Sequence, residues 1–278
     1  MQTLGRIADQ NNARCMRCRA LSGTLCRLSG IASHAEIAAI SGQRFVETGQ
    51  TITANGGQAT NVGTVLAGVL KISRTLPDGR ERIVSLLYPG DFFGQVFSSS
   101  ADFAIEAATD AEICVADRLA FEGVVGRHPA LVRSLLMTMT TALAQAREQA
   151  LLLSCQTTLE RVATYLLVML ARRERMMEEL NVRSLKATAA FKVSRSDVAS
   201  YLGTTFETIS RHIHYLSDRG VISIIDSSHF EVTDRDELQT IAGISDEDVK
   251  LFFAARSGGQ AARKAPHEVV LPFYLPSA

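Results

Sequence analysis

The stretch VSRSDVASYLGTTFETISRHIHYLSDRGVI, residues 193–222, contains two short apolar patterns with a glycine between them. The first pattern brings Val198, Tyr201 and Leu202 to one side of a short helix, and Gly203 follows directly. The second pattern repeats at helical spacing and consists of Phe206, Ile209, Ile213 and Leu216. Two short helices joined by a turn that contains glycine are typical of the helix-turn-helix motif. The sequence therefore predicts this motif, with the apolar side of its second helix facing the domain core.

Polar residues are predicted to face outward near the N-terminus of the second helix; they are Thr204, Glu207, Thr208, Ser210 and Arg211. In a helix-turn-helix these positions meet base edges in the major groove of DNA. An arginine can donate two hydrogen bonds to guanine, and a glutamate can accept one from the amino group of cytosine. Thr204 and Glu207 also fit the spacing of a helix-capping box, which would give Glu207 a purely structural role. The sequence alone leaves both interpretations open.

The segments around this motif predict the rest of the domain and a second one. VISIIDSSHFEVT, residues 221–233, predicts a β-hairpin, so the helix-turn-helix is of the winged kind. The charged run 172–179 is interpreted as a solvated helix end. From about residue 31 to 126, short β-branched and apolar runs alternate with glycines and turn dipeptides, and LPDGR (76–80) places proline and glycine where a tight turn needs them. This half of the chain predicts an antiparallel β-roll.

A long helix is predicted after His128-Pro129, because apolar or small residues recur there at alternating spacings of four and three. They are Val132, Leu136, Met139, Leu143, Ala146, Ala150 and Leu153. Pro129 suits the first turn, and the helix is roughly 39 Å long. A helix that lies on its own domain's core would also be apolar. The narrow and regular seam favours a parallel pair of helices at the two-fold axis of a homodimer.

The composition narrows the class of protein. The chain has 278 residues, 46% of them apolar, and its 29 basic residues balance its 29 acidic ones. A net charge of zero means that any affinity for DNA depends on a local basic patch. We find no signal-peptide pattern and no apolar run long enough to cross a bilayer, so we expect a cytoplasmic protein with no membrane partner. No glycine-rich phosphate loop, His/Glu metal spacing or acid–base pair indicates an enzyme.

Three cysteines, Cys15, Cys18 and Cys26, lie close together in CMRCRALSGTLC. Thiols in the cytoplasm stay reduced, so clustered cysteines there indicate a metal, a cluster or redox chemistry rather than structural disulfides. Tetrahedral zinc sites and iron–sulfur clusters usually take four protein ligands, whereas this stretch supplies three. A structural zinc site and a thiol switch without a cluster are the alternatives to an iron–sulfur cluster.

Three further stretches resemble the CRP/FNR superfamily of transcription regulators, and within it the FNR branch that senses oxygen. YPGDFFG (88–94) is similar to the β-roll motif of that superfamily, LLLSCQTTLERVATYL (151–166) to its hinge and first DNA-domain helix, and ETISRHI (207–213) to the FNR reading helix. The resemblance covers roughly residues 15–243. It implies an α+β fold with an N-terminal antiparallel β-roll similar to cyclic-nucleotide-binding domains, a long dimerisation helix and a C-terminal winged helix-turn-helix.

The resemblance also implies boundaries for the domains. Residues 1–30 would form a cluster-binding arm, residues 31–127 the β-roll sensor domain, residues 128–155 the dimerisation helix and hinge, and residues 156–243 the winged helix-turn-helix domain. Residues 244–278 would form an extension to which we assign no role. FNR-type regulators take their fourth thiol from the β-roll, at the place where Cys114 stands in DAEICVADRLAF. The implied ligands of a [4Fe–4S] cluster are therefore Cys15, Cys18, Cys26 and Cys114.

The function implied by the resemblance is transcription regulation in response to oxygen. A homodimer with an intact cluster would bind a palindrome related to TTGAT-N4-ATCAA, and RNA polymerase would be a further partner. The C-x2-C-x7-C spacing resembles that of one FNR subgroup and is longer than that of another, so the degree of oxygen sensitivity does not carry over.

Cyclic-nucleotide sensors are the other option within the superfamily. Their pockets present a Gly-Glu pair and then an arginine for the cyclic phosphate. Here Gly94 is followed by Gln95, and no Arg or Lys occurs as far as Asp110. A bound anion would have no cationic partner in this stretch, so the sequence disfavours this interpretation.

Overall fold

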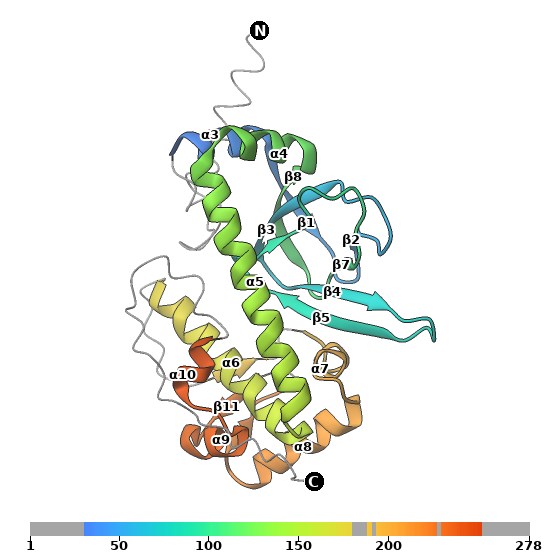
Figure 1. Cartoon of the computed structure of the whole chain (residues 1–278). Coiled ribbons are helices and arrows are strands. Elements are labelled where there is room, and N and C mark those ends of the chain that lie inside the picture. The colour runs from blue at the N-terminus through green and yellow to red at the C-terminus, as the bar shows by residue number, and fades with distance from the viewer. Residues whose placement is uncertain (1–30, 180–187, 191–192, 227–228, 252–278) are drawn as a thin grey trace, which may run out of the picture.

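The structure is a computed structural model that describes residues 31–179, 188–190, 193–226 and 229–251. The fold is of the α+β class: a β-roll is followed by one long helix and then by a second, mainly helical domain (Figure 1). The long helix, α5 (Pro129–Cys155), runs along both parts of the molecule. The predicted fold class and the predicted order of β-roll, long helix and helix-turn-helix are confirmed.

The β-roll consists of two antiparallel four-stranded sheets. The first sheet contains, in spatial order, β1 (Ser41–Val46), β8 (Ala111–Asp117), β3 (Asn61–Ala67) and β6 (Phe92–Phe93). The second contains β2 (Thr51–Thr53), β7 (Ala104–Ala107), β4 (Leu70–Thr75) and β5 (Glu81–Leu87). One apolar core, which includes Val65, Leu70, Phe93 and Ile113, joins strands of both sheets. Its side chains are almost completely removed from water, which is the main source of stability in such a domain.

Turn residues occupy the positions that the sequence predicts. The 76–80 turn joins β4 to β5, and the N–H of Gly79 donates to the carbonyl oxygen of Leu76 at 2.9 Å. Gly94 ends the YPGDFFG motif with a φ of +95°, and a Cβ at this position would lie 2.5 Å from the carbonyl oxygen of Asn61. Both the positive φ and the close backbone approach require glycine.

Three helices cover the outer face of the first sheet: α3 (Ile31–Ile40), α4 (Arg118–Arg127) and the beginning of α5. Their shared core consists of Ile37, Val62, Ala116, Phe121, Val124, Val125, Leu131 and Leu135. Glu36 joins α3 to the junction of α4 and α5, because its carboxylate accepts hydrogen bonds from Arg127 (2.6 Å) and lies 2.8 Å from Nε2 of His128. These bonds, that of Arg127 first, lower the pKa of Glu36.

The C-terminal domain is built around the helix-turn-helix. Its helices are α6 (Thr158–Glu179), α7 (Arg195–Tyr201), α8 (Phe206–Asp218), α9 (Arg235–Ala242) and α10 (Asp246–Leu251). Its sheet has the order β10-β11-β9, formed by Ile222–Ile224, His229–Val232 and Thr188–Ala190. The pairing of β10 with β11 is the predicted hairpin, and β9 adds a third strand that the sequence did not indicate.

The interpretation of the charged run 172–179 as a solvated helix end is wrong at Arg172. The guanidinium carbon of Arg172 lies 4.2 Å from the centre of the Tyr88 ring, and its Nε atom is buried. The side chain therefore leaves α6 and packs on the β-roll. A charge pattern along one helix cannot reveal this contact, because the partner ring comes from a distant part of the chain.

Candidate nucleic-acid interface and sensor site

The helix-turn-helix has a capping residue at the start of each helix. Ser194 Oγ accepts a hydrogen bond from the N–H of Asp197 at 3.0 Å and caps α7. Thr205 Oγ1 accepts from the N–H of Thr208 at 3.3 Å and caps α8. Gly203, in the turn between the helices, has a φ of +65°, a left-handed conformation that glycine adopts without steric cost. These local contacts set where α8 begins and therefore which residues its first turn presents.

Helix α8 has one buried side and one outward side. The buried side consists of Ile209, Ile213 and Leu216, none of which has measurable exposure (0%). Of the predicted base-contacting residues, Glu207 and Arg211 are exposed, and the half-buried ones are Thr204, Thr208 and Ser210. Ser210 Oγ accepts a hydrogen bond from Arg195 of α7 at 3.3 Å. The structure thus brings the predicted residues together along α8 and the turn before it.

Two details of this surface differ from the sequence prediction. Phe206 was expected to face the core but is 49% exposed. It is the first residue of α8, and it lies four residues before Ser210, on the same side of the helix. The capping box of Thr204 and Glu207 is not formed, because Thr205 is the cap and Glu207 is therefore one position too early for it. The sequence pattern missed Phe206 because its spacing to Ile209 also fits the buried side.

The first two turns of α8 present an acceptor and a donor of opposite charge. The pKa of Glu207 is lowered, first by a hydrogen bond from its own backbone N–H and then by the Thr205 hydroxyl and the charge of Arg211. An ionised carboxylate is also favoured there by the helix dipole. Arg211 follows four residues later and is exposed. This pair offers the acceptor that cytosine needs and the forked donor that guanine needs.

Arg161 of α6 ties the hinge to the helix-turn-helix. Its guanidinium group donates to three backbone carbonyl oxygens: Leu153 at 2.8 Å, Gln156 at 3.0 Å and Leu202 at 3.0 Å. Leu153 belongs to α5, Gln156 to the hinge and Leu202 to the turn before α8. One side chain thereby links α5 to the turn before α8. No sequence pattern marks Arg161 for this role, because an arginine beside an apolar helix pattern carries no signal for such long-range contacts.

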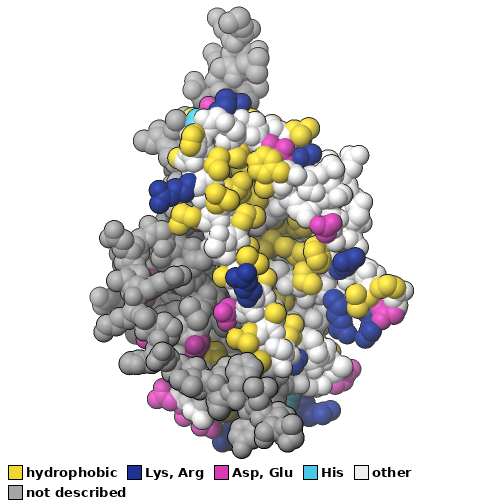
Figure 2. Space-filling view, in the orientation of Figure 1, with side chains coloured by type: hydrophobic (Ala, Val, Ile, Leu, Met, Phe, Trp, Pro, Cys, Tyr) yellow, Lys and Arg dark blue, Asp and Glu magenta, His cyan; other side chains and the backbone are white. Residues whose placement is uncertain are grey.

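An apolar stripe follows α5 on the face shown in Figure 2. Leu136 is 62% exposed and Leu143 is 51% exposed. The other exposed members of the predicted seam are Val132, Met139, Ala146 and Ala150. Leu153 differs, because it is half-buried and packs on the core of the C-terminal domain of its own chain. Leu131, Leu135 and Leu152, on other sides of the helix, are buried within the chain. The seam from Val132 to Ala150 is thus presented at the surface of the protomer.

Cys114 is the only predicted cluster ligand within the described residues; those outside them are Cys15, Cys18 and Cys26. Cys114 is half-buried in the middle of β8, paired with Gln43 on β1 and with Thr64 on β3. Side chains alternate between the two faces of a strand. Cys114 therefore shares a face with Ala116, which belongs to the core under α3, α4 and α5, whereas Ile113 faces the core between the sheets.

The described part of the chain contains no further candidate metal site. No three His, Cys, Asp or Glu side chains there gather closely enough to hold a metal ion. Cys155, the last residue of α5, is exposed. None of the described helices combines the length and the apolar character that crossing a bilayer requires.

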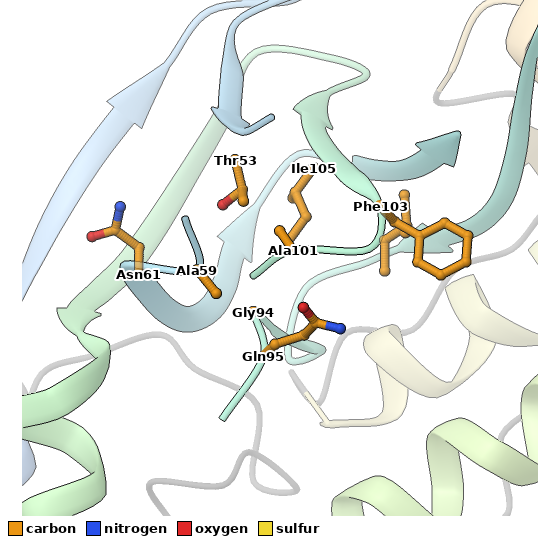
Figure 3. Close-up of a pocket in the computed structure, with 9 residues that line it drawn as sticks. Thr53, Ala59, Asn61, Gly94, Gln95, Ala101, Phe103 and Ile105 are labelled. Carbon is orange, nitrogen blue, oxygen red and sulfur yellow. The ribbon is translucent and has the colours of Figure 1, made fainter. Parts of the chain in front are cut away.

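A pocket of about 180 Å³ lies in the β-roll beside Gly94 (Figure 3). Gln95 lies on one side of it, and Thr53 and Ile105 lie on the other. The Nε2 atom of Gln95 donates to Asp102 at 3.2 Å, and its Oε1 atom is buried without a hydrogen-bond partner among the described residues. None of the described residues that line the pocket is Arg or Lys. An anionic phosphate in this pocket would lack a cationic partner.

Comparison with protein families matches both halves of the chain. Residues 43–128 match the cyclic nucleotide-binding domain, and residues 160–241 match the Crp-like helix-turn-helix domain. The first match covers most of the β-roll and ends just before α5. The second covers α6 to α9 and includes both helices of the helix-turn-helix.

Known proteins resemble the chain over most of their length. A probable transcriptional activator of Rhizobium leguminosarum bv. viciae is 34% identical over 225 residues, which are 81% of this chain and 91% of that protein. The transcriptional activator protein FnrL of Cereibacter sphaeroides is 32% identical over 83% of this chain and 92% of its own. The structure of FixK2 from Bradyrhizobium japonicum superimposes with a TM-score of 0.66 at 27% identity and covers 74% of this chain and 99% of FixK2. The chain belongs to the CRP/FNR family of transcription regulators.

Proposed function

We propose that this regulator responds to oxygen and binds palindromic DNA as a homodimer while a [4Fe–4S] cluster is held by Cys15, Cys18, Cys26 and Cys114. The observation that carries the proposal is the position of Cys114. Its half-buried thiol lies on the outer face of the β-roll, two residues from Ala116 in the core shared with α5. A ligand at this position is joined to the dimer helix through one continuous packed region.

The course of the chain supports a site that includes Cys114. Helix α3 begins at Ile31 and contacts β1 and β8, and β8 is the strand that carries Cys114. Cys26 precedes Ile31 by five residues in the sequence. Five residues span at most about 17 Å when fully extended. The chain length therefore keeps Cys26 within about 17 Å of the start of α3.

The donor set fits the proposed group. Thiolates are the ligands that iron–sulfur clusters take, and four of them match a [4Fe–4S] cluster. The arginines near the N-terminal cysteines would offset the charge of four thiolates; they are Arg14, Arg17, Arg19 and Arg27. When bound, the cluster supplies a centre that oxygen can degrade. The role of the protein is to hold the cluster between the N-terminal arm and β8. In this proposal the arm is fixed only while the four thiols bind the cluster.

The α5 seam is the element that this binding would bias. Leu136 and Leu143 are more than half exposed in the protomer, and Ala146 and Ala150 make the C-terminal part of the seam shallow. A shallow seam gives a weak dimer whose equilibrium a ligand can shift. Shifting a two-state equilibrium from mostly inactive to mostly active needs about 5.5 kcal/mol of differential stabilisation.

In the dimer, each α8 reads one half of the palindrome. Two reading helices bind successive major grooves when they lie about 34 Å apart, which is one turn of DNA. We assign base contacts to Thr204, Glu207, Thr208, Ser210 and Arg211, and Phe206 joins them as an apolar contact for a thymine methyl group. The proposed site is related to TTGAT-N4-ATCAA, and RNA polymerase is the proposed partner of the bound dimer.

The proposal is tested by DNA binding under two atmospheres. Full-length protein purified without oxygen is titrated against a labelled duplex with TTGAT-N4-ATCAA, before and after exposure to air, and its mass is measured by sedimentation. We expect dimer and specific binding without oxygen, and loss of both in air. The Cys155→Ser variant is the control and should behave like the wild type. Equal affinity in both atmospheres would contradict the oxygen response and leave a DNA-binding regulator with a structural zinc site in place of the cluster.

A further inference from the structure

The edge formed by β4 and β5 contacts the helix-turn-helix of the same chain. Figure 1 shows α7 directly below these two strands. Ser200 of α7 bonds to the backbone of β5 in both directions, because its Oγ accepts from the N–H of Ile83 at 3.2 Å and donates to the carbonyl oxygen of Glu81 at 3.3 Å. A serine that satisfies a donor and an acceptor of a neighbouring strand fixes both the distance and the register of the contact.

Lys71 supplies the charged part of this contact. It lies on β4 and is only 8% exposed. Its Nζ atom is 3.1 Å from Glu106 of the neighbouring strand β7, 3.4 Å from Asp197 of α7 and 3.7 Å from Glu81 of β5. Burial lowers the pKa of Lys71, but the hydrogen bond to Glu106 and the three negative charges outweigh it, so the pKa is raised and the amine stays charged.

Asp197 is held in place from its own helix as well. Its Oδ2 atom accepts a hydrogen bond from Ser194, the cap of α7, at 2.8 Å, while its Oδ1 atom faces Lys71. The carboxylate therefore connects the first turn of the helix-turn-helix to the sensor domain. Without Lys71, the carboxylates of Asp197, Glu106 and Glu81 would face one another with no cation between them, which disfavours contact of the two domains.

Apolar and aromatic contacts extend the same interface. Val69, Ile83 and Leu86 of the β-roll belong to one continuous buried cluster with residues of α6, α7 and α8. The hydroxyl of Tyr88 lies 3.2 Å from that of Tyr165 on α6, and the guanidinium group of Arg172 lies over the Tyr88 ring. The two domains are thus packed against each other rather than joined only through the hinge.

We propose that the β4–β5 edge positions the reading helix for DNA, and that Lys71 and Asp197 are positioning residues in this contact. A dimer fixes the spacing of its two reading helices only if each helix-turn-helix is fixed relative to its own α5. Docking on β4 and β5 provides this constraint and leaves the outward side of α8 exposed. A loose domain would have to be ordered when DNA binds, at a cost in affinity.

Two single substitutions that remove charges of opposite sign test this proposal. Lys71→Met removes a positive charge, and Asp197→Asn removes a negative charge. If long-range attraction to DNA were the only effect, the first would weaken binding and the second would strengthen it. Loss of positioning predicts that both weaken binding to the TTGAT-N4-ATCAA duplex, by roughly tenfold, without oxygen. Arg80→Met is the matched control, because Arg80 pairs only with Asp78 in the exposed β4–β5 turn among the described residues, and it should bind nearly as the wild type does.

Hydrogen exchange measured without DNA gives a second readout that does not depend on the proposed DNA site. We expect faster exchange in β5 and α7 of the Lys71→Met and Asp197→Asn variants, with no change at α4 and an unchanged dimer mass. The double variant should be less affected than the sum of the two single effects, since the two residues act through one contact. Ser200→Ala tests the same edge if Lys71→Met does not fold.

The outcomes are distinct. Weaker binding and faster exchange in both charge variants support the positioning role. Stronger DNA binding by Asp197→Asn, or wild-type exchange in β5 and α7 of both variants, would overturn it. If the wild type itself does not bind the duplex, the proposed DNA site fails, and the exchange data alone decide whether the β4–β5 edge holds the helix-turn-helix.

Discussion

Gln149 of α5 donates a hydrogen bond through Nε2 to the backbone carbonyl oxygen of Tyr201, the last residue of α7, at 3.0 Å. Gln149 is 8% exposed, so this bond is shielded from water. Together with the three bonds of Arg161, it joins α5 directly to the helix-turn-helix. These polar contacts couple the position of the helix-turn-helix to that of α5.

The Arg161→Lys substitution should destabilise the hinge. A lysine keeps the charge but lacks the planar fork that reaches Leu153, Gln156 and Leu202 together. Leaving buried carbonyl groups without partners should lower the free energy of unfolding by about 1–3 kcal/mol, as measured by urea denaturation. The control is Arg147→Lys on the exposed surface of α5. Equal stability of the two variants would contradict the role of Arg161.

The Leu136→Glu substitution should prevent dimerisation without unfolding the protomer. Leu136 is 62% exposed in the protomer, so a charge there costs little until two seams meet. Sedimentation should show a monomer under conditions in which the wild type is a dimer. Met137→Glu, next to it but outside the seam, should remain dimeric. If Leu136→Glu is also dimeric, the dimer interface lies elsewhere.

The Arg211→Ala substitution should weaken binding and relax specificity. Loss of a two-bond contact to guanine costs about 1–3 kcal/mol per half-site. The loss should be largest for the TTGAT-N4-ATCAA duplex and small for a duplex in which the guanines of the two half-sites are replaced. Arg133→Ala, which removes an exposed charge from α5, should leave this preference intact. An Arg211→Ala protein with unchanged affinity and preference would exclude the contact.

The Phe206→Ala substitution should weaken specific binding with little change in stability. Phe206 is 49% exposed, so truncating its side chain removes few buried apolar contacts from the free protein. Loss of an apolar contact with a thymine methyl group should cost about 1 kcal/mol per half-site. Replacing the thymines by uracils should remove the difference between wild type and variant. Leu119→Ala, at a remote exposed position, should bind as the wild type does.

Periodic features of the fold could be predicted from the sequence. The apolar sides of α7 and α8, the β10–β11 hairpin and the start of α5 at Pro129 follow from spacing and from proline and glycine positions, and the structure confirms them. The relatives confirm a transcription regulator rather than an enzyme. Phe206 was placed wrongly because its spacing of three to Ile209 also fits the buried side of α8.

Contacts between distant segments could not be predicted in the same way. Lys71 and Asp197 are 126 residues apart in sequence, and neither belongs to a pattern that identifies its partner. In the sequence Arg172 belongs to a charged run, whereas in the structure it packs on the Tyr88 ring. The ligand role of Cys114 rests on the family resemblance, because one cysteine in a strand is also an ordinary half-buried residue.

The central claim is that four thiols, Cys114 among them, hold an iron–sulfur cluster. The most direct test is iron and sulfide analysis, with a visible absorption spectrum, of protein purified without oxygen. We expect about four iron and four sulfide ions per chain in the wild type and in Cys155→Ser, absorption that fades in air, and loss of both ions in Cys114→Ser. A wild type that holds one zinc ion or no metal, or a Cys114→Ser protein that keeps the full content of iron and sulfide, would contradict the claim.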